Sequence, residues 1–230
     1  MGQCRALQRS VADVVDAVLA VALDASCAAC GEPLEQPSRG PVCSVCWRSV
    51  DATIPCVFGI SQAVADAQAI GLYDGALRAV IHGLKYEGRR SLARPLGERM
   101  RDRCRGVLEG ADLVVPVPLH SSRRRQRGFN QAVDLSRQLG LPVAHALRRV
   151  RATKSQTELS EVERRSNVNA AFAPSRRWWV RRQVAAHIVV LVDDVSTTGA
   201  TLNECAVVLK TLGVREVRAV TAARVATSPH

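Results

Sequence analysis

Two adjacent carboxylates stand at the end of an apolar run in the stretch VVLVDDVSTTGAT, residues 189–201. The acids are Asp193 and Asp194, and the polar turn that follows them contains Gly199. A turn from a strand into a helix presents backbone N–H groups, and the helix dipole adds positive charge, so the turn can bind a phosphate. Carboxylates repel phosphate, but they accept hydrogen bonds from sugar hydroxyls or bind Mg²⁺. The stretch favours a ligand such as ribose 5-phosphate; the alternative is a helix N-cap beside an unrelated acidic pair.

A second group of residues predicts a metal site. Four of the eight cysteines form two C-x-x-C pairs with twelve residues between them. Each pair can bind one metal ion from a single turn, and the two pairs together make a tetrahedral zinc site. Two disulfides are the alternative, which a cytoplasmic chain disfavours. Gly31 lies where such a turn needs positive φ. We expect structural Zn²⁺ at Cys27, Cys30, Cys43 and Cys46.

The elements that must position these residues follow from apolar periodicity after residue 60. Helical patterns cover 73–86, with Asp74 as its cap, 89–108, 130–140 and 200–213. Buried strands rich in apolar residues cover 111–119, 187–195 and 214–225. Such strands alternating with helices predict an α/β fold, a mostly parallel sheet with helices on both faces. Ligands then bind at the carboxyl ends of the strands, where Asp193 and Asp194 are expected.

The chain divides into three predicted parts: an amphipathic helix over 1–26, a zinc-binding segment over 27–60, and a larger domain over 61–230. Asp13, Asp16 and Asp24 interrupt the apolar residues of the first part. That pattern is typical of an amphipathic helix and not of a signal sequence or a membrane span. We therefore expect a soluble cytoplasmic protein without membrane insertion.

The net charge of +11 is carried almost wholly by arginine. Arginine binds phosphate in a planar, bidentate way, so the charge suggests nucleic acid or a phosphorylated small molecule as partner. A compositional bias towards arginine is the alternative explanation for part of this positive charge. The basic stretch SRRWWVRRQ contains Trp178 and Trp179, which can stack on bases. We favour a connector whose tryptophans cover the sheet edge. Cys56, outside the C-x-x-C pairs, has no assigned role.

Four motifs in this order resemble one family. They are the paired cysteine turns, LKYEGRR with VVPVPLHSSRRRQRGFNQA, TKSQTELSEVERRSNVNAAF, and the stretch at 189–201. The last resembles the phosphoribosyl-pyrophosphate signature of type I phosphoribosyltransferases. Together the motifs resemble the ComF/GntX family of competence-associated proteins. The resemblance implies the type I phosphoribosyltransferase fold behind a small zinc ribbon.

The resemblance also implies roles for single residues. Asp193 and Asp194 match the acids that bind the ribose hydroxyls, and Arg127 and Gly128 match the pyrophosphate loop. For the neighbouring arginines at 123–125, the alternative to pyrophosphate binding is that they form a solvated face of the protein. Lys85 matches a family lysine without an assigned role. The 5′-phosphate loop matches Ser196, Thr197, Thr198, Gly199, Ala200 and Thr201.

The polar segment 153–172 resembles the flexible loop that closes over the pyrophosphate, with Gln156, Arg164 and Asn167 matching the family pattern. An ordinary hairpin connection is the alternative.

Two functions remain open from the sequence. The first is an enzyme that binds phosphoribosyl pyrophosphate with Mg²⁺ and transfers the phosphoribosyl group to an unidentified acceptor. The second is a non-catalytic sensor of a phosphoribosyl ligand, or a DNA-uptake accessory protein that binds single-stranded DNA or a partner of the uptake machinery. The intact acidic pair and phosphate loop favour ligand binding under both hypotheses.

Overall fold

The computed structural model describes Asp16, residues 25–151 and residues 171–226. Most of the helix predicted over 1–26 lies outside the described residues, as do the predicted loop residues Gln156, Arg164 and Asn167. Within the described ranges, no helix is long and apolar enough to cross a membrane.

The larger sheet has five strands in the order β1-β2-β7-β6-β3. Strands β2, β7, β6 and β3 run parallel, and β1 pairs with β2 in the antiparallel sense. The predicted mostly parallel sheet is therefore confirmed. The bounds are β1 Cys56–Val57, β2 Asp66–Ala69, β3 Leu113–Pro116, β6 Ile188–Ser196 and β7 Glu216–Arg224. A separate antiparallel pair is formed by β4 Leu147–Arg149 and β5 Phe172–Pro174.

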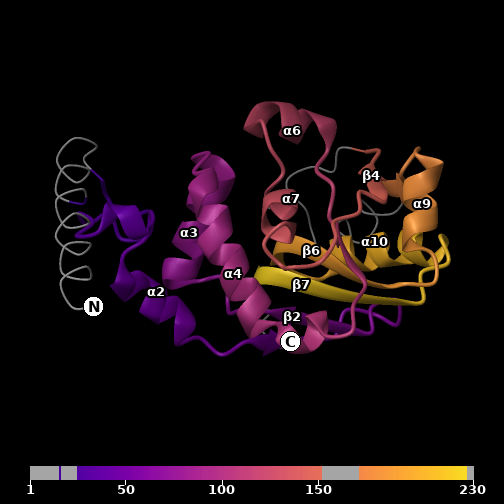
Figure 1. Cartoon of the computed structure of the whole chain (residues 1–230), viewed down its shortest axis with the longest axis horizontal. Helices are drawn as coiled ribbons and strands as arrows, with labels where there is room; N and C mark the ends of the chain where they lie inside the picture. Colours follow the sequence, from indigo (N-terminus) through magenta and orange to yellow (C-terminus); the bar gives the residue numbers. More distant parts are fainter. Residues whose placement is uncertain (1–15, 17–24, 152–170, 227–230) are drawn as a thin grey trace, which may run out of the picture.

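Each face of this sheet is covered by its own apolar core. Alternate strand residues point to opposite faces, so Val190 and Val192 belong to one core and Val189 and Leu191 to the other. The first core contains residues of α3 Gly75–Tyr86, α4 Ala93–Arg103 and α7 Gln131–Ser136. The second contains residues of α10 Ala200–Lys210 and of the β4–β5 pair. Figure 1 shows α3 and α4 beside the sheet and α10 close to β6.

The predicted helices differ from the observed ones mainly at their ends. The pattern over 89–108 forms three pieces, η2 Arg90–Leu92, α4, and α5 Arg105–Leu108. The break falls at Cys104, whose φ of −108° and ψ of 28° are not helical. Helix α7 stops at Ser136, whose hydroxyl donates to the Ala132 carbonyl, a contact that weakens a helix locally. Asp74 occupies the N-cap position of α3, but its side chain makes no capping hydrogen bond.

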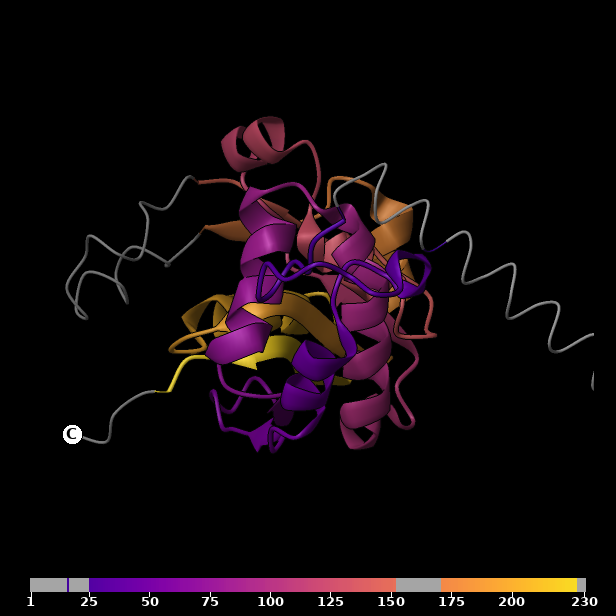
Figure 2. The same ribbon diagram turned by 90° about the vertical axis from the view of Figure 1, so that its left-hand side faces the viewer.

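The cysteine-bearing segment packs against α3 and α4. It contains η1 Pro37–Arg39 and α2 Ser44–Asp51. Its residues Leu34 and Val50 belong to the same core as the helices of the larger part. Arg99 of α4 lies 3.7 Å from the ring centre of Trp47 and pairs with Asp51 at 3.0 Å. Both ribbon views place this segment along the α3–α4 side of the molecule (Figures 1 and 2). The domain division near residue 60 remains a prediction.

Candidate functional site

Strand β6 carries both predicted acids and runs past them. Its pairing with β7 continues to Ser196, which lies opposite Arg224. The sequence predicted this strand over 187–195, and the observed bounds of β6 differ from that range by one residue at each end. Because side chains alternate along a strand, the two carboxylates reach the strand end from opposite faces of the sheet. Asp194 contacts α3 and α7, whereas the charge of Asp193 acts on Cys205 of α10.

Asp194 is buried and fully partnered. Its Oδ1 lies 2.8 Å from Lys85 Nζ, and its Oδ2 accepts a hydrogen bond from Gln131 Nε2 at 3.0 Å. Burial acts to lower the pKa of Lys85, but the adjacent Asp194 charge outweighs it, and the pKa is raised. The lysine that the sequence left without a role is therefore the cationic partner of the second acid.

Asp193 lies in a different electrostatic setting. Burial and the neighbouring Asp194 charge raise its pKa to about 7, although Lys85 and Arg149 act in the opposite direction. Its Oδ1 accepts a hydrogen bond from the Asp194 backbone N–H at 2.8 Å. A carboxyl group with this pKa changes its charge near neutral pH, where small changes in its surroundings matter most.

The turn after β6 leads directly into α10. Gly199 is the N-cap of α10 with φ +79°, and a Cβ at this position would lie 2.9 Å from Ile60 Cγ2. Both facts require glycine here. Thr198 is exposed, and Thr197, Ala200 and Thr201 are half-buried. Ser196 belongs to β6 and is buried, and its hydroxyl has no partner among the described residues, so it lies beneath the turn. The phosphate-binding role of these residues remains a prediction.

The segment predicted as a pyrophosphate loop is largely helical. Helix α6 spans Ser121–Arg127, with the His120 ring accepting a hydrogen bond from the Ser122 backbone N–H as its N-cap. Gly128, at φ +76°, ends it. The helix buries none of its residues, and arginines can therefore occupy three adjacent positions without any of them being buried. Figure 1 shows α6 standing at the rim of the molecule, above α7.

Helix α6 carries Arg127 to the end of α3. Its guanidinium lies 5.0 Å from the ring centre of Tyr86, at the end of α3. Between α3 and α6 is a cavity of about 360 Å³, the α3–α6 cavity, which joins Arg127 to Lys85. Its lining residues are Lys85, Tyr86, Glu87, Gly88, Gln126, Arg127 and Phe129. Arg127 and the Asp194 partner Lys85 therefore line one cavity.

Sequence reasoning missed Gln131, Arg149 and Glu204. Gln131 lies inside the quoted motif GFNQA, so the signal was present, but nothing in the sequence pairs it with Asp194. Arg149 acts on Asp193 from β4, and Glu204 Oε1 accepts a hydrogen bond from the Phe172 backbone N–H at 3.2 Å. The last contact ties α10 to β5. All three depend on elements that are distant in the sequence.

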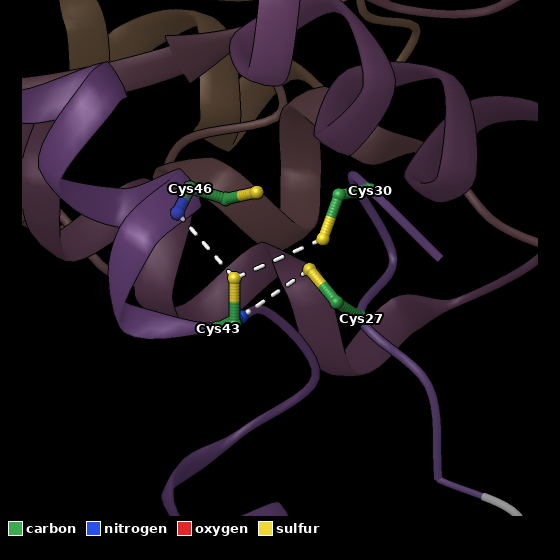
Figure 3. A group of neighbouring side chains, drawn as sticks. All are labelled: Cys27, Cys30, Cys43 and Cys46. Atoms are coloured by element: carbon green, nitrogen blue, oxygen red, sulfur yellow. Dashed lines mark hydrogen bonds between the residues drawn. The ribbon is translucent and has the colours of Figure 1, made fainter. Parts of the chain in front are cut away.

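The four predicted metal ligands come together. Their sulfur atoms all lie within 4.8 Å of one another, and Figure 3 shows them pointing into one space. A tetrahedral site with Zn–S bonds of about 2.3 Å requires S···S distances of about 3.8 Å. The Cys30 and Cys43 sulfurs are 3.9 Å apart, which fits this requirement and is far too long for a disulfide. The cluster can therefore hold a structural metal ion such as Zn²⁺.

Backbone N–H groups point at the cluster, as a thiolate site requires. Cys27 Sγ accepts hydrogen bonds from Ala29 N at 3.4 Å and Cys43 N at 3.3 Å. Burial opposes ionisation of Cys27, but contacts with the backbone N–H groups of Cys30, Cys43 and Ala29 lower the pKa of the thiol to about 6. Gly31 follows the first pair with φ +78°, as predicted.

The remaining described cysteines lie apart from this cluster. Cys104 and Cys205 are fully buried core residues. Cys56 lies in β1, with Sγ 3.7 Å from the Ile54 carbonyl.

The connector predicted around the two tryptophans is instead a short helix, α9 Trp178–Val184. Trp178 and Trp179 are 62% and 54% exposed, so they do not cover the sheet edge. Their rings meet edge to face with centres 6.2 Å apart. The structure therefore corrects the predicted role of this segment.

Comparison with known proteins agrees with the fold. A family model for the phosphoribosyl transferase domain matches residues 125–229. The chain is 39% identical to competence protein F of Haemophilus influenzae, over 65% of this chain and 68% of that protein. It is 31% identical to DNA utilization protein YhgH of Salmonella typhimurium, over 84% of this chain and 93% of that protein.

A solved structure described as the allosteric regulatory enzyme of purine biosynthesis is 21% identical, with a TM-score of 0.37 over 57% of this chain and 26% of that one. That score is too low to carry an argument, so the fold assignment rests on the family model and the two relatives. The chain has the type I phosphoribosyltransferase fold preceded by a four-cysteine cluster, and it belongs to the ComF/GntX family, together with competence protein F and YhgH.

Proposed function

We propose that the protein binds phosphoribosyl pyrophosphate with Mg²⁺ and transfers the phosphoribosyl group to an acceptor, releasing pyrophosphate. The observation that carries this proposal is the order of groups at the end of β6. Asp193 and Asp194 are followed at once by a glycine-containing turn into α10, inside the region that matches the phosphoribosyl transferase domain. A ribose with a 5′-phosphate requires this succession of hydrogen-bond acceptors and anion-binding backbone groups.

The proposed roles divide between the two acids. Asp194 is already paired with Lys85 and Gln131, so its negative charge is compensated. Asp193 is then the acid for the ribose hydroxyls or for Mg²⁺, which prefers carboxylate oxygens. Arg127 would contact the pyrophosphate, and the turn at 196–201 the 5′-phosphate. In the reaction, the bond from the anomeric carbon to pyrophosphate breaks, and a bond to the acceptor nucleophile forms as the acceptor loses a proton.

Two further parts of the proposal concern the metal cluster and the compartment. We assign the four cysteines to structural Zn²⁺ and place the protein in the cytoplasm. Four thiols gathered as metal ligands, which must stay reduced to bind the ion, support a reducing compartment.

The ligand assignment is tested by thermal unfolding. Phosphoribosyl pyrophosphate with Mg²⁺ should raise the Tm of the wild-type protein, and Asp193→Asn should remove most of that increase. Asp102→Asn, at a surface ion pair, is the matched control and should keep it. No increase in the wild type would disprove the ligand assignment. Pyrophosphate release measured over a panel of acceptors then distinguishes an enzyme from a sensor.

A second candidate is a DNA-uptake accessory protein that binds single-stranded DNA. The names of the relatives and the net charge of +11 favour it. Its test is the affinity for an oligonucleotide as a function of salt, because each neutralised phosphate adds to the salt dependence. Affinity equal to that of an unrelated basic protein of the same charge would contradict this candidate.

A further inference from the structure

Helix α9 has one buried side and one exposed side. Val184 is buried in the second core, and the half-buried Val180 packs against that core. The exposed side carries Trp178 and Trp179, each more than half exposed. Single apolar side chains are common on protein surfaces, but two adjacent tryptophans form a larger apolar patch, and such patches mark contact sites. Figure 1 shows α9 at the outer edge of the molecule, on the side away from α3.

A groove of about 390 Å³ lies between α9 and the residues that follow α10, and we call it the α9 groove. Its volume is at the lower end of the range of binding sites, roughly 300–1,000 Å³, so it has room for a large side chain. Apolar side chains and two guanidinium groups share its walls. None of its residues belongs to β6, to the turn at 196–201 or to α6, so the proposed phosphoribosyl transfer leaves the groove without a role. The lining residues are Trp178, Arg181, Arg182, Ala185, Thr211 and Leu212.

The positive charge around the α9 groove has no carboxylate partner in the part of the chain that the structure describes. Helix α9 contains no aspartate or glutamate, and neither residue type lines the groove. None of the ion pairs between described residues involves an arginine of this stretch. A partner that carries carboxylates would supply the missing negative charge. The four arginines are Arg176, Arg177, Arg181 and Arg182, and all are exposed.

Two of these arginines also cover the tryptophan rings. The Arg182 guanidinium lies 5.7 Å from the ring centre of Trp178, and the Arg177 guanidinium lies 5.8 Å from that of Trp179. The two ring planes meet at 86°. Successive bases of a nucleic-acid strand stack on open aromatic faces. Here one face of each ring is occupied and the two planes cross, so the surface favours protein side chains over a run of stacked bases.

We propose that α9 and the α9 groove form a docking surface for an acidic segment of a partner protein. One large apolar side chain of that segment enters the groove against Trp178 and Leu212, and neighbouring carboxylates pair with Arg181 and Arg182. Guanidinium groups bind carboxylates in a planar, bidentate geometry, and tryptophan and arginine contribute most to binding at protein interfaces. A contact of this small size is expected to be weak and reversible. The proposal is independent of phosphoribosyl transfer and of the binding of single-stranded DNA.

The experiment uses the full-length, zinc-loaded protein and measures the binding of labelled peptides by fluorescence anisotropy. The probes are peptides of aspartate and glutamate with phenylalanine, leucine, isoleucine or tryptophan at the centre. The reference peptide has serine at that position. At least one probe should bind, and the serine peptide should bind at least ~10-fold more weakly than the best probe, because the groove then receives no apolar side chain.

The test variant combines Trp178→Ala with Arg182→Gln. The control combines Ile54→Ala with Arg105→Gln, two highly exposed side chains outside the groove. Each variant loses one exposed apolar side chain and one positive charge. The test variant alone should bind the best probe at least ~10-fold more weakly, and both variants should keep the Tm of the wild type.

The proposal is overturned if none of the probes binds, if the serine peptide binds as tightly as the best probe, or if the test and control variants weaken binding equally. The last two results would mean attraction by net charge only. An oligothymidylate of matched charge that displaces the probe, and that also binds the test variant at least ~10-fold more weakly, would assign the surface to nucleic acid instead. Displacement of the probe by phosphoribosyl pyrophosphate with Mg²⁺ would also overturn the proposal, because the groove would then be part of the β6 site. Asp193→Asn should leave the probe bound.

Discussion

At the scale of single residues, the candidate site depends on two adjacent aspartates that have different charge and hydrogen-bond partners. Asp194 has a lysine and an amide as partners, whereas burial and the charge of Asp194 raise the pKa of Asp193 to about 7. Two like charges at neighbouring positions repel, so one of them is more easily neutralised. Lys85 determines which one keeps its charge.

Replacing Lys85 tests this assignment. Lys85→Met leaves the Asp194 carboxylate buried without a cation, and breaking a buried pair in this way costs about 3–5 kcal/mol. We expect a loss of that size in urea unfolding. Adding Asp194→Asn should restore most of it, because the charge that lacked a partner is removed. A loss under about 1 kcal/mol in the single variant would contradict the pairing.

The raised pKa of Asp193 predicts a specific dependence of stability on pH. The folded-state pKa of about 7 lies above the ordinary value of 3.8. The stability linked to this group is therefore complete below pH 3.8 and is lost as the pH rises through about 7. The Asp193→Asn variant does not show this loss. Its free energy of unfolding should therefore exceed that of the wild type by a margin that is about 1–4 kcal/mol larger at pH 8 than at pH 5. Unfolding in urea at both pH values measures it, and a difference independent of pH would refute the assignment.

At the scale of elements, the turn between β6 and α10 is held in one shape by Gly199. Its positive φ and its close approach to Ile60 each exclude a side chain. The same turn closes the strand that carries the acids and begins the helix whose dipole points at the proposed phosphate.

Replacing Gly199 should damage both stability and ligand binding. Gly199→Ala is expected to cost about 1–3 kcal/mol, because it adds backbone strain and a clash with Ile60. Ile60→Ala added to it should relieve the clash but not the strain, so recovery is partial. Gly106→Ala, where a Cβ meets open space and φ is not positive, should be neutral. Thermal unfolding with and without phosphoribosyl pyrophosphate measures both effects, and equal Tm values for Gly199→Ala and Gly106→Ala would contradict the expectation.

At the scale of the whole molecule, the cysteine cluster and the sheet share one core. Leu34, Val42 and Val50 of the cysteine-bearing segment pack in the same cluster as Leu77 and Leu96 of the helices. Arg99 adds a contact with Trp47 and an ion pair with Asp51. The metal-binding segment therefore stabilises the face of the sheet on which α3 carries Lys85.

Metal removal should accordingly destabilise the molecule as one unit. Structural zinc contributes on the order of 10 kcal/mol of binding energy, and about 1 kcal/mol moves the Tm of a chain of this size by about 2–4 °C. Cys43→Ser should abolish metal binding and lower the Tm by roughly 10 °C or more, in a single transition. Cys56→Ser, outside the cluster, should keep both metal and Tm. Two separate transitions would show that the segment unfolds alone.

The elements and the local motifs can be read from the amino-acid sequence alone. Apolar runs and helical periodicity predicted the strands and helices, since burial on one or both faces leaves a pattern in the chain. The spacing of the cysteines predicted the metal ligands because each pair lies within one turn. The acids, the glycine turn and the order of four motifs predicted the family and the phosphate loop.

How these parts contact one another becomes visible only in the folded chain. Lys85, Gln131 and Asp194 come from three elements. No local sequence pattern indicates that Lys85 forms a buried ion pair with Asp194 and that the Gln131 amide donates a hydrogen bond to the same carboxylate. The same holds for six arginines between Arg90 and Arg177, which are far apart in the sequence and line one cavity. The helical form of 121–127 and the exposed tryptophans of α9 also escaped the sequence, because both elements bury almost none of their residues and so leave no apolar period. Contacts between distant segments are set by the packing of the whole sheet and its helices, and that information appears only when the chain is folded.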